Sequence, residues 1–214
     1  MTSPLPELNT PAKTFSDTQI ELNQLEEKLN WEELYSSKGP VIVEIGSGKG
    51  HFIIKSAAEN PDKNFLGIEK SLKYSRILNK RAEKAGLTNL RILNAEAEYF
   101  VSKYIPENSV SECHIYFSDP WPKKRHNKRR LINPSFLKAV TRSLKPGGCI
   151  YYATDFKDYF DQIVKVSRAC KGIEEIIYQE INPSDEDPEA ALTNYERKYL
   201  IQGRPIYKAS YEKL

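Results

Sequence analysis

Strand-like and helix-like segments alternate along most of the chain, and this alternation limits the possible folds more than any other feature. Apolar, β-branched stretches of three to six residues each precede a longer stretch with helical spacing. Strands are expected at 41–43, 64–68, 90–93, 112–117 and 149–153, and helices over about 50–59, 71–85, 134–144 and 156–170. The pattern predicts an α/β protein with a mostly parallel sheet and helices on both faces.

The two ends of the chain extend this core. Residues 1–15 hold three prolines and few apolar groups, which indicates a flexible arm. Apolar residues at roughly helical spacing between 17 and 35 predict a helix within a 16–39 extension. Two later runs, 173–181 and 197–208, are interpreted as strands. A length of 214 residues suits one domain, here 16–214.

A glycine loop follows the first strand and opens a helix. Gly46, Gly48 and Gly50 allow a sharp turn and the close approach of a ligand. The loop lacks the dinucleotide fingerprint, which would need Gly or Ala where His51 stands, and it lacks the phosphate-loop pattern as well. Glu44, two residues before the first glycine, would repel a diphosphate and attract an ammonium or a sulfonium.

Two more carboxylates follow the next strands. Glu69 ends the strand at 64–68, where an acid can accept hydrogen bonds from both hydroxyls of a ribose. Glu96 follows the strand at 90–93, within reach of an adenine amino group. Ammonium, ribose and adenine together describe S-adenosylmethionine. The alternative is a tight strand–helix turn beside three solvated acids.

A carboxylate beside a cationic run marks the end of the strand at 112–117. Asp119 lies in a turn between Ser118 and Pro120, and six cations follow within residues 123–130. Residues 174–189 carry seven acids and no Lys or Arg, and the net charge is only +3. A local basic surface of this kind indicates selective docking of nucleic acid, although a solvated charge run would look the same.

Other classes of site and location find little support. Three cysteines without a Cys-x-x-Cys pair, and three scattered histidines, favour neither a zinc site nor a disulfide framework, so no metal is expected. The start of the chain is not a signal peptide, and no apolar run has membrane-spanning length. The expected location is therefore the cytoplasm, with no membrane partner.

Several motifs together resemble the tRNA (guanine-N7-)-methyltransferases of the single-subunit bacterial type, the TrmB family. The likeness covers about residues 40–208, and its most specific element is Asp119-Pro120-Trp121-Pro122-Lys123-Lys124-Arg125-His126. That element lies within a matching segment at 117–131, and the other matching segments are 44–50, 67–69, 154–155 and 193–196. The family usually has Asp where this chain has Glu96.

The resemblance implies a Rossmann-like class I methyltransferase fold with a seven-stranded sheet, and S-adenosylmethionine as methyl donor. It implies that the donor lies among Glu44, Gly46, Gly48, Gly50, Glu69, Glu96 and Asp119. It implies that the substrate is held by Lys123, Asp155, Thr193, Asn194, Tyr195 and Glu196, and that RNA is contacted by Lys124, Arg125, Lys128, Arg129 and Arg130. The implied target is the variable-loop guanine, position 46, of tRNA.

Guanine N7 carries a lone pair and no proton, so the reaction needs orientation rather than a general base. Asp119 is the expected catalytic residue, accepting from guanine N1–H and the amino group, or holding the ammonium of the donor. Trp121 either stacks on a base or packs on the turn, and Asp155 is also a candidate N-cap of the next helix.

Two alternatives to this function stay open at this point: an inactive RNA-binding protein of the same fold, and a methyltransferase for another RNA, a protein or a small molecule. No obligate protein partner is evident from the sequence, and both a monomer and a homodimer remain open.

Overall fold

The computed structural model describes residues 19–20, 25 and 27–214 and forms one eight-stranded sheet in the order β1-β4-β3-β2-β5-β6-β8-β7. β8 runs antiparallel to both of its neighbours, and the other pairs are parallel. The strands are β1 (Gln19–Ile20), β2 (Val41–Ile45), β3 (Asn64–Ile68), β4 (Leu90–Leu93), β5 (Val110–Tyr116), β6 (Leu144–Thr154), β7 (Ile173–Ile181) and β8 (Ile206–Lys213). The expected mostly parallel α/β sheet is confirmed, with one short strand more than the predicted seven.

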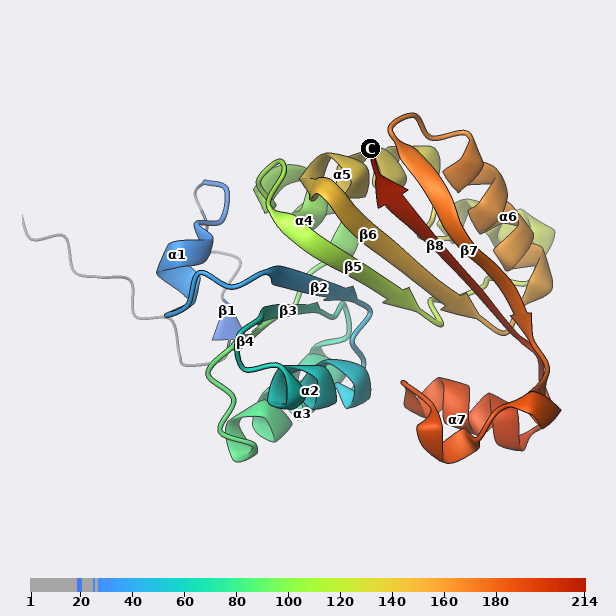
Figure 1. The fold of residues 1–214 in the computed structure, drawn as a ribbon, viewed down its shortest axis with the longest axis horizontal. Helices are drawn as coiled ribbons and strands as arrows, with labels where there is room; N and C mark the ends of the chain where they lie inside the picture. Colours follow the sequence, from blue (N-terminus) through green and yellow to red (C-terminus); the bar gives the residue numbers. More distant parts are fainter. Residues whose placement is uncertain (1–18, 21–24, 26) are drawn as a thin grey trace, which may run out of the picture.

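The helices form two layers around this sheet (Figure 1). They are α1 (Trp31–Leu34), α2 (His51–Glu59), α3 (Leu72–Lys84), α4 (Ala97–Tyr104), α5 (Pro134–Ser143), α6 (Lys157–Arg168) and α7 (Asn194–Ile201), together with the 3₁₀ turn η2 (Lys124–Arg129) and two shorter 3₁₀ turns, η3 (Pro183–Asp185) and η4 (Pro188–Ala190). Asn133 caps α5 as expected, because its side chain accepts from the Phe136 N–H at 3.0 Å.

The core alternates across the sheet because successive strand residues point to opposite faces. Ile42 and its partner Phe65 pack with α2 and α3 on one face. Val43 and its partner Leu66 belong to the larger cluster beneath α4, α5 and α6 on the other face. All four of these side chains are 2% exposed or less, so both faces of the central strands are buried as in a doubly wound sheet.

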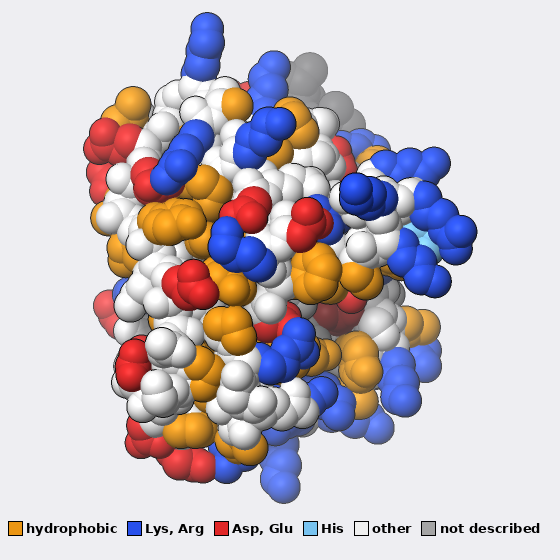
Figure 2. Space-filling model, turned by 90° about the vertical axis from the view of Figure 1, so that its right-hand side faces the viewer, with side chains coloured by type: hydrophobic (Ala, Val, Ile, Leu, Met, Phe, Trp, Pro, Cys, Tyr) orange, Lys and Arg blue, Asp and Glu red, His pale blue; other side chains and the backbone are white. Residues whose placement is uncertain are grey.

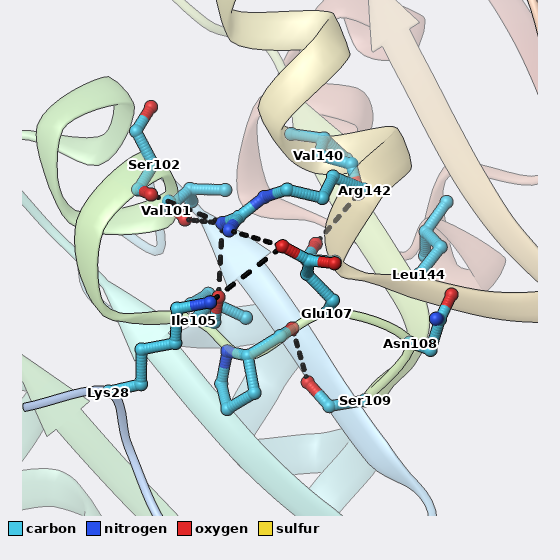
Figure 3. Close-up of polar contacts among 12 residues, drawn as sticks. Lys28, Val101, Ser102, Ile105, Glu107, Asn108, Ser109, Val140, Arg142 and Leu144 are labelled. Atoms are coloured by element: carbon cyan, nitrogen blue, oxygen red, sulfur yellow. Dashed lines mark hydrogen bonds and ion pairs between the residues drawn. The ribbon is translucent and has the colours of Figure 1, made fainter.

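Arg142 on α5 ties the end of α4 to the core (Figure 3). Its Nη2 donates to the carbonyls of Val101, Ser102 and Ile105 at 3.0, 3.2 and 3.1 Å. Its Nη1 lies 3.5 Å from Glu107 Oε1. The last carbonyls of a helix have no partner within the helix, so this guanidinium satisfies them from a neighbouring element.

The predicted helix over 17–35 is wrong for most of the residues of that span that the structure describes. Gln19–Ile20 pairs in parallel with Ile92 and Leu93 of β4, and only Trp31–Leu34 is helical. Ile20 is 1% exposed, so covering the edge of β4 outweighs the helical spacing of its neighbours. The expected arm at 1–15, and residues 16–18, 21–24 and 26 of the expected extension, lie outside the described residues.

The predicted strand at 197–208 is also wrong over most of its length. Residues 194–201 form α7, Gly203 with φ of 67° follows the helix, and β8 begins only at 206. The Thr193 side chain caps α7 by accepting from the Glu196 N–H at 3.0 Å. Thr193-x-x-Glu196 is the capping signature that marks a helix start, and the strand interpretation overlooked it.

Candidate active site

The site lies where the strand order reverses. β2 pairs with β3 on one side and with β5 on the other, so the connections after β2 and β5 leave the sheet in opposite directions and open a crevice. A cavity of about 980 Å³ occupies this crevice. Its lining includes Glu44, Gly46 and Gly48 from the first connection and Asp119 from the other. The glycine loop and Asp119 thus share one hollow, as the proposed chemistry requires.

The three glycines of the loop all adopt left-handed backbone conformations, with φ of 78°, 54° and 80° at Gly46, Gly48 and Gly50. Such values strain any residue with a Cβ. Gly46 N donates to Ile68 O at 2.8 Å, which anchors the loop to β3. Gly50 differs from the other two, because a Cβ there would lie 2.1 Å from Leu78 Cδ1. We therefore assign Gly50 to the packing of α2 on α3 rather than to ligand contact.

Glu44 is a buried carboxyl on the wall of the cavity. Its side chain belongs to a residue that is 5% exposed, and its Oε2 has no hydrogen-bond partner among the described residues. Burial raises the pKa of Glu44 to about 8, Ser47 opposes the shift through a hydrogen bond, and the charge of Glu69 adds to it. An unpaired buried acid is costly unless a ligand supplies the missing positive charge and donors.

Glu69 and Glu96 lie at the ends of β3 and β4, and both line the cavity. The Glu69 carboxylate accepts from Gly48 N at 2.7 Å and from Ser71 N at 2.6 Å, so it holds the glycine loop to the start of α3. Glu96 is exposed and caps α4 by accepting from Tyr99 N at 2.9 Å. Both carboxylates keep further lone pairs that can accept from a ligand.

The Asp119 turn is held in an unusual conformation. Phe117 and Trp121, two residues to either side, have φ of 51° and 45°. Left-handed backbone at bulky residues costs free energy and is typical of functional turns. Arg130 Nε donates to Pro120 O at 2.8 Å and its Nη1 donates to Gln162 Oε1 at 2.8 Å. The turn containing Asp119 is therefore braced from α6.

This bracing corrects the expectation that Arg130 contacts RNA. Its side chain is only 1% exposed, and it also forms an ion pair with Asp158 on α6. Arg130 also lines the cavity, but its Nε, Nη1 and Nη2 each donate inside the protein, so this buried guanidinium offers less to a phosphate than its exposed neighbours do. Arg130 is therefore a structural residue of the site.

The other five cations of the run are exposed around the 3₁₀ turn η2. Lys128 and Arg129 line the cavity, whereas Lys123, Lys124 and Arg125 do not. The Arg129 guanidinium carbon lies 4.9 Å from the centroid of the Trp121 ring, and His126 meets the same ring edge-on at 5.8 Å. Figure 2 shows Lys and Arg side chains crowded around a histidine at one edge of the molecule. Trp121 thus organises the cationic turn, and it also lines the cavity.

The late loop divides the residues that the resemblance grouped together. Thr193, Asn194 and Tyr195 line the cavity from the start of α7. Glu196 points elsewhere, because its Oε2 accepts from Leu192 N at 2.9 Å and its Oε1 lies 2.6 Å from Lys208 Nζ. Tyr195 is 50% exposed and stacks on Phe117 with 6.1 Å between ring centroids.

Asp155 does not line the cavity, since it forms an ion pair with Arg204 just after α7. The N-cap of α6 is Phe156, and the Thr154 hydroxyl accepts from the Phe156 N–H at 3.2 Å. The possible capping role of Asp155 is therefore not observed. Its pairing instead fixes the position of the segment that carries α7.

Sequence reasoning missed several cavity residues. They include Lys49, Tyr74, Tyr116 and Ser118. Of these, Tyr116 could have been found from the sequence, because it ends a strand at the same edge of the sheet as Glu44. His51, one of the three scattered histidines, also lines the cavity. Burial, followed by the charges of Arg81, Lys55 and Arg197, lowers the pKa of its imidazole.

These groups fit S-adenosylmethionine. The unpaired Glu44 oxygen can accept from an ammonium, Glu69 lies where an acid can meet a ribose, and Glu96 lies beyond it at the next strand end. The described residues contain no cluster of three or more His, Cys, Asp or Glu side chains able to hold a metal ion. None of the described helices combines the length and the apolar character needed to cross a bilayer.

Comparison with known proteins agrees with this geometry. A family profile described as "Putative methyltransferase" matches residues 38–209. The tRNA (guanine-N(7)-)-methyltransferase of Alkalilimnicola ehrlichii is 35% identical over 186 residues, which cover 86% of this chain and 77% of that protein. The enzyme of the same name from Geobacter metallireducens is 33% identical over 89% of this chain and 90% of its own length.

Solved structures support the fold. The crystal structure of the 16S rRNA methyltransferase KamB superposes with a TM-score of 0.66 at 18% identity, covering 88% of this chain and 96% of that one. TrmN from Thermus thermophilus gives a TM-score of 0.60 at 18% identity, covering 82% and 44%. With the match over most of the sequence and the shared crevice, the chain belongs to the tRNA (guanine-N(7)-)-methyltransferase family.

Proposed function

We propose that this protein transfers the methyl group of S-adenosylmethionine to N7 of a guanine in tRNA, and that the target is the variable-loop guanine at position 46. One observation carries the proposal: a buried acid with an unpaired oxygen, Glu44, and the carboxylate of Asp119 share a cavity with the cations Lys128 and Arg129. The names of the relatives support the reaction and the tRNA substrate.

The donor is held by residues at the ends of the first three core strands. Glu44 accepts from its ammonium, Glu69 from its ribose and Glu96 from its adenine, while Gly46 and Gly48 allow close approach. The bound donor supplies a methyl group on a sulfonium, which is an electrophile that needs no acid or base. Desolvation around Glu44 strengthens its attraction for the cation.

Asp119 orients the guanine. Guanine N7 has a lone pair in the ring plane, so the protein has to align that lone pair with the methyl carbon and the sulfur. An Asp119 carboxylate that accepts from N1–H and the exocyclic amino group would fix this alignment, and it would stabilise the positive charge that develops on the methylated base. Arg130 Nε donates to Pro120 O at 2.8 Å, and this hydrogen bond braces the turn and gives the Asp119 carboxylate a defined position.

RNA approaches over the exposed cationic turn. We assign phosphate contacts to Lys123, Lys124, Arg125, Lys128 and Arg129, and leave Arg130 out because it is buried. Thr193, Asn194 and Tyr195 face the same cavity, so they contact the substrate directly. Asp155 and Glu196 affect substrate binding indirectly, because their ion pairs with Arg204 and Lys208 hold α7 in place. The enzyme works in the cytoplasm as a monomer or a homodimer.

Methyl transfer to an unmodified tRNA transcript tests the proposal. The purified protein, the transcript and methyl-labelled donor are incubated, and the product is cleaved at 7-methylguanosine to map the site. A transcript with adenine at position 46 is the matched control and should stay unlabelled. Label on another nucleoside would refute the guanine N7 assignment, and label retained in the control transcript would refute position 46. A tRNA that binds without accepting methyl would identify an inactive RNA-binding protein.

A further inference from the structure

Three polar side chains follow one another on one face of β5 and end at the donor cavity. Glu112, His114 and Tyr116 alternate along the strand, so they project from the same face. Glu112 Oε2 lies 3.0 Å from His114 Nε2, and His114 Nδ1 lies 2.8 Å from the Tyr116 hydroxyl oxygen. Both nitrogens of the imidazole therefore have a partner: Nε2 contacts Glu112 toward the amino end of the strand, and Nδ1 contacts Tyr116, which lines the cavity.

The imidazole is rigidly enclosed and neutral. His114 is 6% exposed, with the Phe52 ring 4.8 Å away on one side and the Tyr151 ring stacked at 4.8 Å and 10°. Burial lowers the pKa of His114, and this outweighs the opposing hydrogen bond and charge of Glu112; the charge of Lys63 lowers it slightly further.

The carboxylate decides which imidazole nitrogen carries the proton. The hydrogen bond with His114 is the largest cause that lowers the pKa of Glu112, so this group is an ionised acceptor with no proton to give. Nε2 must then be the protonated nitrogen, and Nδ1 of the neutral ring presents a lone pair. The Tyr116 O–H is consequently the donor in the 2.8 Å contact. Its proton points away from the cavity, and its oxygen can only accept from a ligand.

Tyr116 and Glu44 line the same cavity on adjacent strands. Glu44 is the register partner of His114, and burial, followed by the charge of Glu44, raises the pKa of Tyr116. Glu44 Oε2 is itself unpaired among the described residues. Two acceptors on neighbouring strands suit a group that offers several N–H donors and no acceptor, such as a primary ammonium.

We propose that Tyr116 is a second acceptor for the ammonium of the methyl donor, and that Glu112 and His114 are positioning residues that keep its hydroxyl proton out of the cavity. This inference rests on the proposed use of S-adenosylmethionine, and it concerns how the chain recognises the amino-acid part of that donor. If Nδ1 carried the proton instead, the Tyr116 hydroxyl would turn its hydrogen to the cavity and would repel the ammonium.

Binding of two ligands with an uncharged thioether sulfur separates this role from a general effect on structure. S-adenosylhomocysteine keeps the ammonium, and 5′-methylthioadenosine lacks it. Tyr116→Phe should weaken the affinity for S-adenosylhomocysteine about tenfold, the effect of one hydrogen bond to a charged group, and leave that for methylthioadenosine unchanged. Tyr151→Phe is the matched control, because the Tyr151 ring stacks on the same imidazole but does not line this cavity. It should bind both ligands normally.

Equal losses for both ligands, or none, in Tyr116→Phe would overturn the inference. The outcome is independent of methyl transfer, because a wild-type protein that binds S-adenosylhomocysteine but never methylates tRNA would refute the proposed function and leave this inference intact. A wild-type protein that binds neither ligand would refute both.

Nitrogen-15 NMR of the imidazole tests the positioning role directly. The wild type should show His114 protonated at Nε2 alone, and an Nδ1–H ring would overturn the inference. In Glu112→Gln the amide can turn either its oxygen or its nitrogen toward His114 Nε2. Lys63 Nζ lies 3.5 Å from the other carboxylate oxygen of Glu112 and would attract the amide oxygen, which leaves the amide nitrogen facing Nε2 and favours the Nδ1–H ring. Tautomer and affinity must change together. An Nδ1–H ring with unchanged affinity, or an Nε2–H ring with lost affinity, would refute the coupling.

Discussion

Replacing Glu44 with Gln should stabilise the ligand-free protein, and the gain should grow with pH. Burial raises the pKa of Glu44 to about 8, from an ordinary value of 4.5 that applies in the unfolded chain. Between these two values the folded protein holds a proton that the unfolded chain has released. Stability contributed by the neutral carboxyl is therefore complete at low pH and is lost as the pH rises.

The size of the effect follows from the two pKa values. A group that titrates at 4.5 when unfolded and at about 8 when folded lowers the free energy of unfolding by about 2.5 kcal/mol between pH 5 and pH 7. Glutamine has nearly the same shape and does not titrate. The difference in unfolding free energy, Glu44→Gln minus wild type, should therefore increase by about 2.5 kcal/mol over that interval.

Urea titrations of both proteins at pH 5, 6 and 7 measure this difference. Glu175→Gln is the control, because hydrogen bonds from Arg168 and Tyr211 help to lower the pKa of Glu175 below its ordinary value. Both the ordinary pKa of 4.5 and the lowered pKa of the folded protein lie below this interval, so its difference from wild type should stay nearly flat between pH 5 and pH 7. A flat or shrinking difference for Glu44→Gln would refute the view that the buried Glu44 carboxyl destabilises the ligand-free protein near neutral pH.

Three further outcomes test the site and the fold. Asp119→Asn should lower kcat for tRNA methylation by about a hundredfold with an unchanged melting temperature, and near-normal turnover would contradict its orienting role. Lys128→Gln combined with Arg129→Gln should reduce the slope of log affinity for tRNA against log salt by about 0.9 for each lost phosphate contact, and an unchanged slope would mean that the turn faces away from RNA. Arg142→Met should cost about 2–4 kcal/mol of unfolding free energy, because three helix-end carbonyls lose their donor. Lys28→Gln, which breaks only an exposed 3.8 Å ion pair nearby, should change it by less than about 1 kcal/mol, and equal effects would contradict the capping role of Arg142.

Local patterns in the sequence determined the central sheet and the position of the crevice. The strands at 64–68 and 90–93 agree residue for residue with β3 and β4, because short apolar runs between turn signals form buried parallel strands. Glu44, Glu69, Glu96 and Asp119 could be placed together because the carboxyl ends of parallel strands meet at one edge of the sheet. These inferences depend only on periodicity and on this general rule of parallel sheets.

Only the tertiary structure decided which charged residues face a ligand. Arg130 looks like its cationic neighbours in the sequence, yet its donors are used by Pro120 and by Gln162, 32 residues away. Asp155 ends a strand near the crevice, yet Arg204 pairs with it. The direction of the Tyr116 hydroxyl likewise depends on Glu112 through His114. A side chain's residue type determines the charge or hydrogen-bonding capacity that it has, but partners brought close by folding determine how much of it remains for function.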